Sequence, residues 1–368
     1  MKVFQVLAAV WSVCLCACTG GAEEPPLALS SVPTDSGTKR AVVVFNRRNK
    51  ESREIAELYA AKRGLPPSHV ISVACETHDN MPFDLYKEQI EAPVRQAIRS
   101  LPEPVDFIVV TKGIPIRLRD NAGYSLDGHL ACMDLALDPI SKPDQQSLRR
   151  CLNPYFGKNE SFSSQRYGFY LVTRLDGYTA EDAKRLIESS AAAKPNKGPF
   201  LIDSDPRKAG PEAMRPYHDS LSRAGEVLQA KGFQVILDRN DRFVGSSRPL
   251  AGYASWGSND GSFDEKAYKG LKFLPGAIAE TFVSYSARTF GRVEGGQSVI
   301  TDLIAGGITG AKGYVSEPYT FALARPDILF DRYTAGFTLA ESFSMASPIL
   351  KWKDVVVGDP LCAPYAKK

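Results

Sequence analysis

Five short polar segments in this sequence could carry chemistry, and each follows directly on an apolar run. Lysine and arginine side chains can hold an anion, carboxylates can hold a proton or a hard cation, and a serine hydroxyl can act as a nucleophile when a base lies nearby. We therefore expect a binding or catalytic site wherever these segments meet, and they are residues 111–113, 174–177, 203–205, 255–260 and 284–288.

Within these segments, a catalytic role is most readily imagined for Ser284 and Ser286, with Glu280 or Lys112 as the base. The other polar side chains are candidates for binding. A turn, a helix cap or a network of salt bridges without catalysis would also account for them. The candidate binding residues are Lys112, Asp127, Arg174, Asp176, Asp203, Trp256, Ser258, Asn259, Asp260, Arg288 and Glu317.

Metal binding is one alternative for the carboxylates. Asp127, Asp176 and Asp203 could together bind a divalent cation such as Ca²⁺ or Mg²⁺, although nothing in their spacing requires one. The four histidines are scattered and there is no Cys/His cluster, so the sequence argues against a zinc site. No cofactor is evident.

The elements that must position these residues alternate between strand and helix. Strands are predicted from short apolar runs, such as 41–46, 105–110, 250–255, 276–284 and 310–315, and helices over 51–63, 86–100, 212–231 and 297–304. Thr179 is expected to cap a further helix. The pattern predicts an α/β fold, a doubly wound and mostly parallel sheet with helices on both faces, whose strands end at one edge. Residues 119–165 are polar and irregular, and are expected to form an inserted lobe.

The start of the chain has the pattern of an export signal. Lys2 precedes an apolar run that ends in Leu15-Cys16-Ala17-Cys18, which resembles the bacterial lipobox. We therefore expect residues 1–17 to be a lipoprotein signal peptide, 18–40 a flexible tether and 41–368 a single α/β domain. Acylation of Cys18 would hold the protein at a membrane. With no acidic sorting residue after Cys18, the outer membrane, facing the periplasm, is favoured over the inner membrane.

Charge and cysteine usage add two expectations. The net charge of +3 is close to neutral, which argues against nucleic acid as a partner. In an oxidising compartment the four cysteines that follow the lipobox invite pairing. Cys132 and Cys151 are the expected disulfide, because both lie in the irregular lobe.

Long blocks of the chain resemble an uncharacterised bacterial family found in genomes that carry exosortase, the membrane enzyme proposed to sort proteins with a PEP-CTERM tail. These blocks cover nearly all of residues 41–365. The resemblance implies a genomic context rather than a reaction. The blocks include TKGIPIRL (111–118), GYASWGSND (252–260), LPGAIAETFVSYSARTF (274–290) and VVVGDPLCAPY (355–365).

The second half is also similar in order to the gingipain and caspase-like peptidases. In those enzymes one strand ends in a His-Gly-Ser turn, the next ends at the catalytic Cys, and a Gly-Asp-Pro segment follows near the end of the domain. Here Trp256-Gly257-Ser258 stands at the turn, residues 284–286 at the position of Cys, and Gly358-Asp359-Pro360 at the last segment. The resemblance thus implies the fold without its catalytic His and Cys.

These observations favour a membrane-anchored binding or scaffolding protein with a non-catalytic caspase-like core, linked to exosortase-type export or to surface polysaccharide. Aromatic residues near the sheet edge would suit a glycan or an extended peptide, namely Trp256, Tyr285, Tyr314 and Tyr319. The alternative is a hydrolase, peptidase-like or metal-assisted, that uses Ser284, Ser286 or the aspartate cluster.

Overall fold

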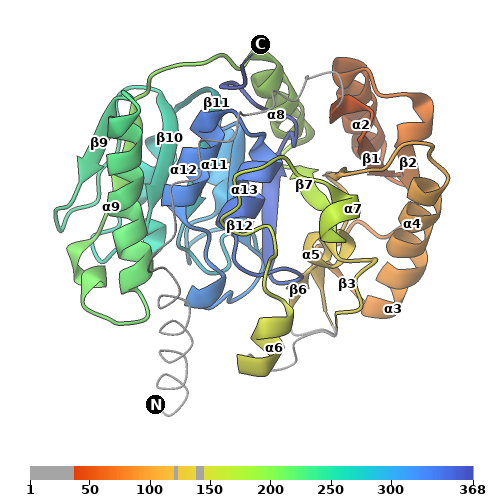
Figure 1. Cartoon of the computed structure of the whole chain (residues 1–368), viewed down its shortest axis with the longest axis horizontal. Coiled ribbons are helices and arrows are strands. Elements are labelled where there is room, and N and C mark those ends of the chain that lie inside the picture. The colour runs from red at the N-terminus through yellow and green to blue at the C-terminus, as the bar shows by residue number, and fades with distance from the viewer. Residues whose placement is uncertain (1–36, 120–122, 138–144, 368) are drawn as a thin grey trace, which may run out of the picture.

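A ten-stranded sheet runs through the whole molecule (Figure 1). The structure is a computed structural model, and it describes residues 37–119, 123–137 and 145–367. The order of the strands is β2-β1-β4-β7-β13-β12-β11-β10-β8-β9. Their bounds are Ala41–Asn46 (β1), Val70–Val73 (β2), Phe107–Thr111 (β4), Leu171–Leu175 (β7), Phe200–Asp203 (β8), Val235–Asp238 (β9), Leu250–Ser255 (β10), Phe273–Thr281 (β11), Gly310–Tyr314 (β12) and Asp354–Gly358 (β13).

Parallel pairing dominates on both sides of β13. β2, β1, β4 and β7 pair in parallel, and so do β12, β11, β10, β8 and β9. β13 lies between these groups, antiparallel to β12, and meets β7 through the pair Val357 and Arg174. The carboxyl ends of the two groups lie close together, as one contact shows. Arg117, after β4, donates a hydrogen bond to the carbonyl of Val315, after β12. We call this side of the molecule the carboxyl edge.

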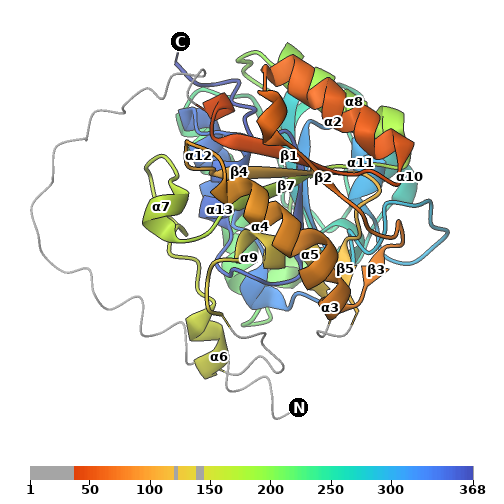
Figure 2. The ribbon, with the colours of Figure 1, turned by 90° about the vertical axis from the view of Figure 1, so that its right-hand side faces the viewer.

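Helices cover both faces of the sheet, as the sequence predicts. In Figure 2 α2 (Lys50–Arg63) and α8 (Ala180–Ala192) lie on the opposite face of the sheet from α4 (Ala92–Arg99) and α5 (Leu126–Ala131). The residues of β1 alternate between the two layers: Val43 packs with the α2 side, and Val42 and Val44 pack with the α4 side. A strand buried on both faces needs an apolar residue at every position, which explains the run AVVVF. The remaining helices that flank the second half are α9 (Arg215–Ala230), α10 (Glu265–Gly270), α11 (Ile300–Ala305), α12 (Pro326–Ala335) and α13 (Leu339–Ala346).

The inserted region is partly integrated into the fold. A small sheet joins β3 (Asn80–Met81), β5 (Arg117–Leu118) and β6 (Tyr124–Ser125). The helix α5 begins directly after β6, and its residues Leu126 and Leu130 belong to the apolar layer beneath β1 and β4. Two short helices follow, α6 (Gln145–Arg150) and α7 (Ser164–Tyr167). The other described residues of the segment form turns and irregular structure.

The predicted disulfide between Cys132 and Cys151 is wrong for this structure. Both side chains are buried free thiols, and so are Cys75 and Cys362. Cys132 packs in the apolar cluster that holds Leu171, whereas Cys151 packs in a separate cluster with Trp352. Apolar contacts therefore hold this region where we expected a covalent link.

The signal peptide, the lipobox with Cys18 and most of the tether lie outside the described residues. Within the described part of the chain, no helix combines the length and the apolar character that crossing a bilayer requires.

Candidate functional site

Four of the predicted site residues meet around one buried arginine. Arg174, at the end of β7, has no exposed side-chain surface. Its Nε and Nη2 donate to the two carboxylate oxygens of Asp127 at 2.9 and 2.6 Å, and its Nη1 donates to Asp176 at 3.2 Å. Lys112 adds an ion pair with Asp176 at 3.2 Å. These four residues therefore form a network of salt bridges. Such a network is the alternative to a binding site that the sequence left open.

The predicted metal triad is not assembled. Asp127 and Asp176 are both paired with Arg174, whereas Asp203 ends β8, and four strands separate β8 from β7. The described residues contain no cluster of three or more His, Cys, Asp or Glu side chains that could hold a metal ion. The prediction of a cation site on these three aspartates is therefore wrong, because two of the carboxylates are already neutralised by an arginine and the third is remote.

Asp203 lies in a second acidic group at the carboxyl edge. It is buried, its Oδ2 accepts a hydrogen bond from the backbone N–H of Val244, and its Oδ1 has no partner. Burial, together with the nearby carboxylates of Asp260, Asp238 and Asp205, raises the pKa of Asp203 to about 7. Arg207 bridges Asp205 and Asp260 at 2.7 and 3.1 Å. Arg207 thus neutralises Asp205 and Asp260, and no ion pair with a described residue neutralises Asp203.

The loops after β10 and β11 adjoin, as the resemblance to caspase-like proteins implies. The Nδ2 of Asn259 donates to the carbonyl of Phe282 at 2.6 Å. Ser258 and Ser298 exchange hydrogen bonds between backbone and side chain at 2.9 and 3.2 Å. Ser258 and Asn259 therefore hold these loops together.

Trp256 is not available to a ligand. Its indole is buried and packs edge-on against Phe282, with ring centroids 4.9 Å apart. The Nζ of Lys208 lies 5.6 Å from the ring. The prediction that Trp256 binds a ligand is wrong, because its side chain is part of the core.

The proposed catalytic group does not form either. Glu280 is fully buried in mid-strand, where it accepts a hydrogen bond from the hydroxyl of Tyr314 at 2.9 Å. Burial raises the pKa of Glu280 to about 8. Ser286 is also buried, and its Oγ accepts from the backbone N–H of Tyr314. Within the described residues, no hydrogen bond joins Glu280 or Lys112 to Ser286 or to the half-buried Ser284.

Two aromatic residues at this edge are exposed. Tyr285, after β11, and Tyr319, after β12, keep 40% and 43% of their surface accessible, whereas Tyr314 is buried. Both have a φ of +59°, in the left-handed region that L-residues avoid. In the described part of the chain one other residue besides glycine has a positive φ, and it is Lys351, just before β13. The three therefore lie on loops of neighbouring strands, and such strain concentrates at functional sites.

Arg288 and Glu317 are held within the same loops. The guanidinium of Arg288 donates to the carbonyls of Tyr285 and Gln297 at 3.2 and 2.9 Å. The carboxylate of Glu317 accepts from the backbone N–H of Tyr319 at 2.9 Å. Both side chains thus support the exposed tyrosines.

One contact between a serine and a histidine was not predicted from the sequence. The hydroxyl of Ser204 lies 3.2 Å from Nδ1 of His218, which comes from α9. The two residues are fourteen positions apart in the sequence, a separation that matched none of the patterns considered, so only the fold reveals the pair. Ser204 has no exposed surface, and this contact therefore fixes α9 to the end of β8 rather than presenting a nucleophile.

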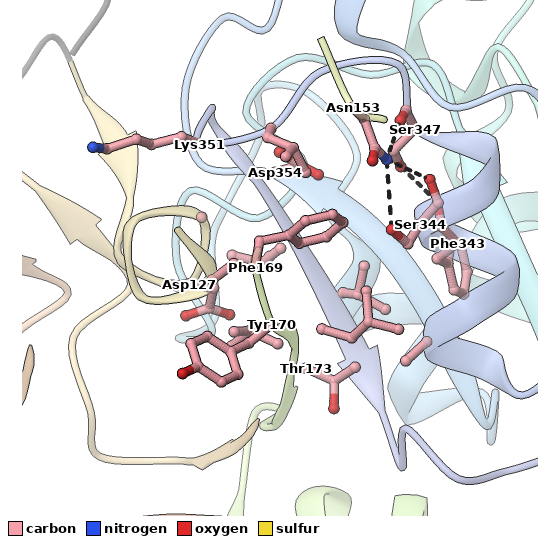
Figure 3. A pocket seen from close by; sticks show the side chains of 18 of the residues that line it. Asp127, Asn153, Phe169, Tyr170, Thr173, Phe343, Ser344, Ser347, Lys351 and Asp354 are labelled. Atoms are coloured by element: carbon pink, nitrogen blue, oxygen red, sulfur yellow. Dashed lines mark hydrogen bonds between the residues drawn. The ribbon is translucent and has the colours of Figure 1, made fainter. Parts of the chain in front are cut away.

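A cavity of about 70 Å³ lies over β7 and β13, between α5 and α13 (Figure 3). Asn153 lines it and is held by the carbonyls of Ser344 and Ser347, each at 2.8 Å. Thr173 also lines it, and its hydroxyl has no partner. Sites for small organic ligands are typically several times larger, about 300–1,000 Å³. This cavity has room for a few water molecules.

Comparison with known proteins gives a fold. No protein-family profile and no curated protein sequence matches the chain. A solved structure described as "Structure of Protease" has a TM-score of 0.53 and 11% identity, over 89% of this chain and 78% of that chain. The complex of the pro- and mature domains of Porphyromonas gingivalis RgpB gives 0.49 and 12%, over 88% and 79%. The predicted α/β architecture, a mostly parallel sheet with helices on both faces, is confirmed, and the first of these structures shares the fold.

Proposed function

We propose that this chain is an exported lipoprotein, anchored through Cys18, whose caspase-like domain binds a peptide or a glycan at the carboxyl edge without cleaving it. The observation that carries the proposal is a difference in exposure between residues at that edge. Tyr285 and Tyr319 are exposed in strained backbone at the ends of neighbouring strands, while Trp256 and Ser286, at the positions of catalysis, are buried.

Physical chemistry supports binding over cleavage. A serine has a pKa far above 7 and needs a base to attack a carbonyl. Ser284 has no hydrogen-bond partner among the described residues, and Glu280 faces the core. Tyrosine, in contrast, offers a large apolar ring and a hydroxyl at low entropic cost, which suits a binding surface.

The anchor is supported by the sequence. An apolar run that ends in Leu15-Cys16-Ala17-Cys18 precedes a segment rich in Pro, Gly, Ser and Thr, which would act as a flexible tether. Several acyl chains at Cys18 would give stable membrane attachment. The resemblance to exosortase-associated proteins supports a role in export or in handling surface polysaccharide, on the periplasmic face of the outer membrane.

Screening the purified full-length chain against immobilised peptides and oligosaccharides tests the binding function. We expect at least one class to bind, and the double variant Tyr285→Gly/Tyr319→Gly to lose that binding. Glycine adopts a positive φ without strain, so these variants keep the backbone while removing the rings. The control is Ile236→Ala, which trims an exposed side chain on the edge strand β9.

The same preparation is assayed for cleavage of any ligand that binds. We expect no product from wild type. Turnover that disappears in Ser284→Ala, with binding retained, would establish the hydrolase instead. For the anchor, Cys18→Ser is expected to move the chain from the membrane fraction to the soluble fraction of the cell envelope.

A further inference from the structure

Three cations at the carboxyl edge bind only backbone carbonyl or amide oxygens. Arg117 donates to Asn80 and to the carbonyl of Val315 at 2.6 and 2.9 Å. Arg288 donates to the carbonyls of Tyr285, Gln297 and Gly295. Lys353, just before β13, donates to the carbonyl of Glu317 at 2.9 Å.

Several arginines elsewhere in the molecule face carboxylates instead. Arg63, Arg174 and Arg207 each face a buried carboxylate. None of the three edge cations forms an ion pair with a described residue. Lys353 is buried, and the carboxylate of Glu317 lies near it. Arg117 and Arg288 are half-buried, and theirs are the two positive charges at the edge that a ligand could neutralise.

The cations flank the exposed rings. Arg288 contacts the backbone of Tyr285 directly, and the Nζ of Lys353 lies 5.5 Å from the ring centroid of Tyr319. Tyr319 stacks on Phe321 with centroids 5.8 Å apart and planes 15° from parallel. One ring face is thus supported by a second ring. We call Arg117, Tyr285, Arg288, Tyr319 and Lys353 the rim cluster.

The position in the sheet argues against an extended peptide. Peptides bind to sheets by adding a strand to an open edge, where main-chain groups lack partners. β11 and β12 are interior strands paired on both sides, and the open edges are β2 and β9. A ligand at the rim cluster must therefore be recognised by its faces and its charge.

We propose that the rim cluster binds an acidic glycan, with the tyrosine rings against sugar faces and with Arg117 and Arg288 paired to uronate carboxylates. This inference rests on the proposed binding function and names its ligand. Guanidinium–carboxylate hydrogen bonds are about twice as strong as neutral ones and give the ligand a fixed orientation. Sugar rings present C–H groups that pack on an aromatic face much as apolar side chains do.

Calorimetric titration of the full-length chain with an oligogalacturonate tests the inference. The matched probes are the same oligosaccharide with its carboxyl groups reduced to alcohols, and a polyglutamate of equal charge. We expect the oligogalacturonate to bind at least tenfold more tightly than either. Added salt should weaken this binding, because the charges meet near solvent.

Two variants locate the site. Arg288→Gln and Tyr319→Gly are each expected to weaken oligogalacturonate binding at least fivefold, with unchanged thermal midpoints. Arg239→Gln, which removes an exposed charge after β9, is the matched control and should bind as wild type.

The outcomes separate the two proposals. Equal binding of the carboxyl-reduced sugar, or tighter binding of polyglutamate, overturns the acidic-glycan inference while the binding function stands. The same holds if no oligogalacturonate binds but the screen above finds a peptide. If nothing binds in either experiment, both proposals fail.

Discussion

At the scale of single residues, Arg174 determines how the inserted region meets the sheet. Its guanidinium connects three segments: Asp127 at the start of α5, Asp176 after β7, and the carbonyls of Ile114 and Pro115 after β4. Every donor direction is used, and no part of the side chain is exposed. A buried charge of this kind is tolerated only while all its partners are present.

Replacing Arg174 with methionine is expected to destabilise the protein by about 3–5 kcal/mol, because Asp127 would be left buried without a cation and Asp176 would keep only Lys112. Urea unfolding followed by circular dichroism measures the change. The matched control is Arg166→Met, whose ion pair with Glu160 is exposed and should contribute less than about 1 kcal/mol. Equal costs for the two variants would show that the Arg174 network is not what joins these segments.

Asp203 gives a prediction on pH. Its pKa is raised from 3.8 to about 7, so the folded state holds a proton that the unfolded state releases above pH 4. Stability from this group is therefore full below about pH 4 and declines as pH rises towards 7, by at most about 4 kcal/mol. In Asp203→Asn the decline is absent. The unfolding free energy of the variant, relative to wild type, should rise between pH 4 and 7, and a constant difference would contradict the assignment.

The sequence could identify the polar residues of the edge but not their exposure. Trp256 directly follows β10, Glu280 lies within β11 and Ser286 lies in the turn after β11, yet each is buried. A strand covered on both faces buries every side chain, so alternation carries no information on which side faces solvent. The exposure of Tyr285 depends instead on a positive φ, which a tyrosine does not signal.

At the scale of elements, α8 shows how local sequence sets a helix start. Thr179 accepts from the N–H of Asp182, whose carboxylate accepts in return from the N–H of Thr179. This capping box fixes the turn through Gly177 that leads from Asp176 into the helix. The cap was predicted from the sequence, because its pattern is short-range.

Thr179→Ala is expected to cost about 1 kcal/mol of stability, since the cap bond is lost and a backbone N–H is left without a partner. Thr179→Ser keeps the hydroxyl and should cost only a few tenths of that. Chemical denaturation of the three proteins side by side measures both changes. A serine variant as unstable as the alanine variant would mean that the methyl group, not the cap, is what matters.

Other elements were displaced or missed. β10 has the bounds that were predicted, but the strand expected at 276–284 spans Phe273–Thr281 and the helix expected at 297–304 begins at Ile300. α12, α13 and β13 were not predicted. The helix α13 is buried on almost all sides. Its sequence therefore lacks the alternation of an apolar and a polar face by which a surface helix is recognised.

At the scale of the whole molecule, the last strand joins the two halves of the chain. β13 comes from residues 354–358, yet it lies at the centre of the sheet, between β7 of the first half and β12 of the second. The sequence predicts the alternation of strands and helices, but it does not predict that β13 lies between β7 and β12. Which strands pair in a sheet depends on contacts between residues far apart in the chain. Asp359 then accepts hydrogen bonds from Tyr59 and Ser190 and forms an ion pair with Arg63, all from the first half.

Ending the chain at Lys353 should therefore prevent folding, although it removes only residues 354–368. Without β13, the facing backbone groups of β7 and β12 lose their partners within the sheet, and Arg63 loses its carboxylate. We expect the truncated protein to show no cooperative thermal transition and to be digested rapidly by protease. A chain ending at Ala366 lacks only two lysines and should melt as wild type does. Cooperative melting of the shorter chain would mean that the two halves hold together through their helices, and that β13 completes the sheet after the rest has folded.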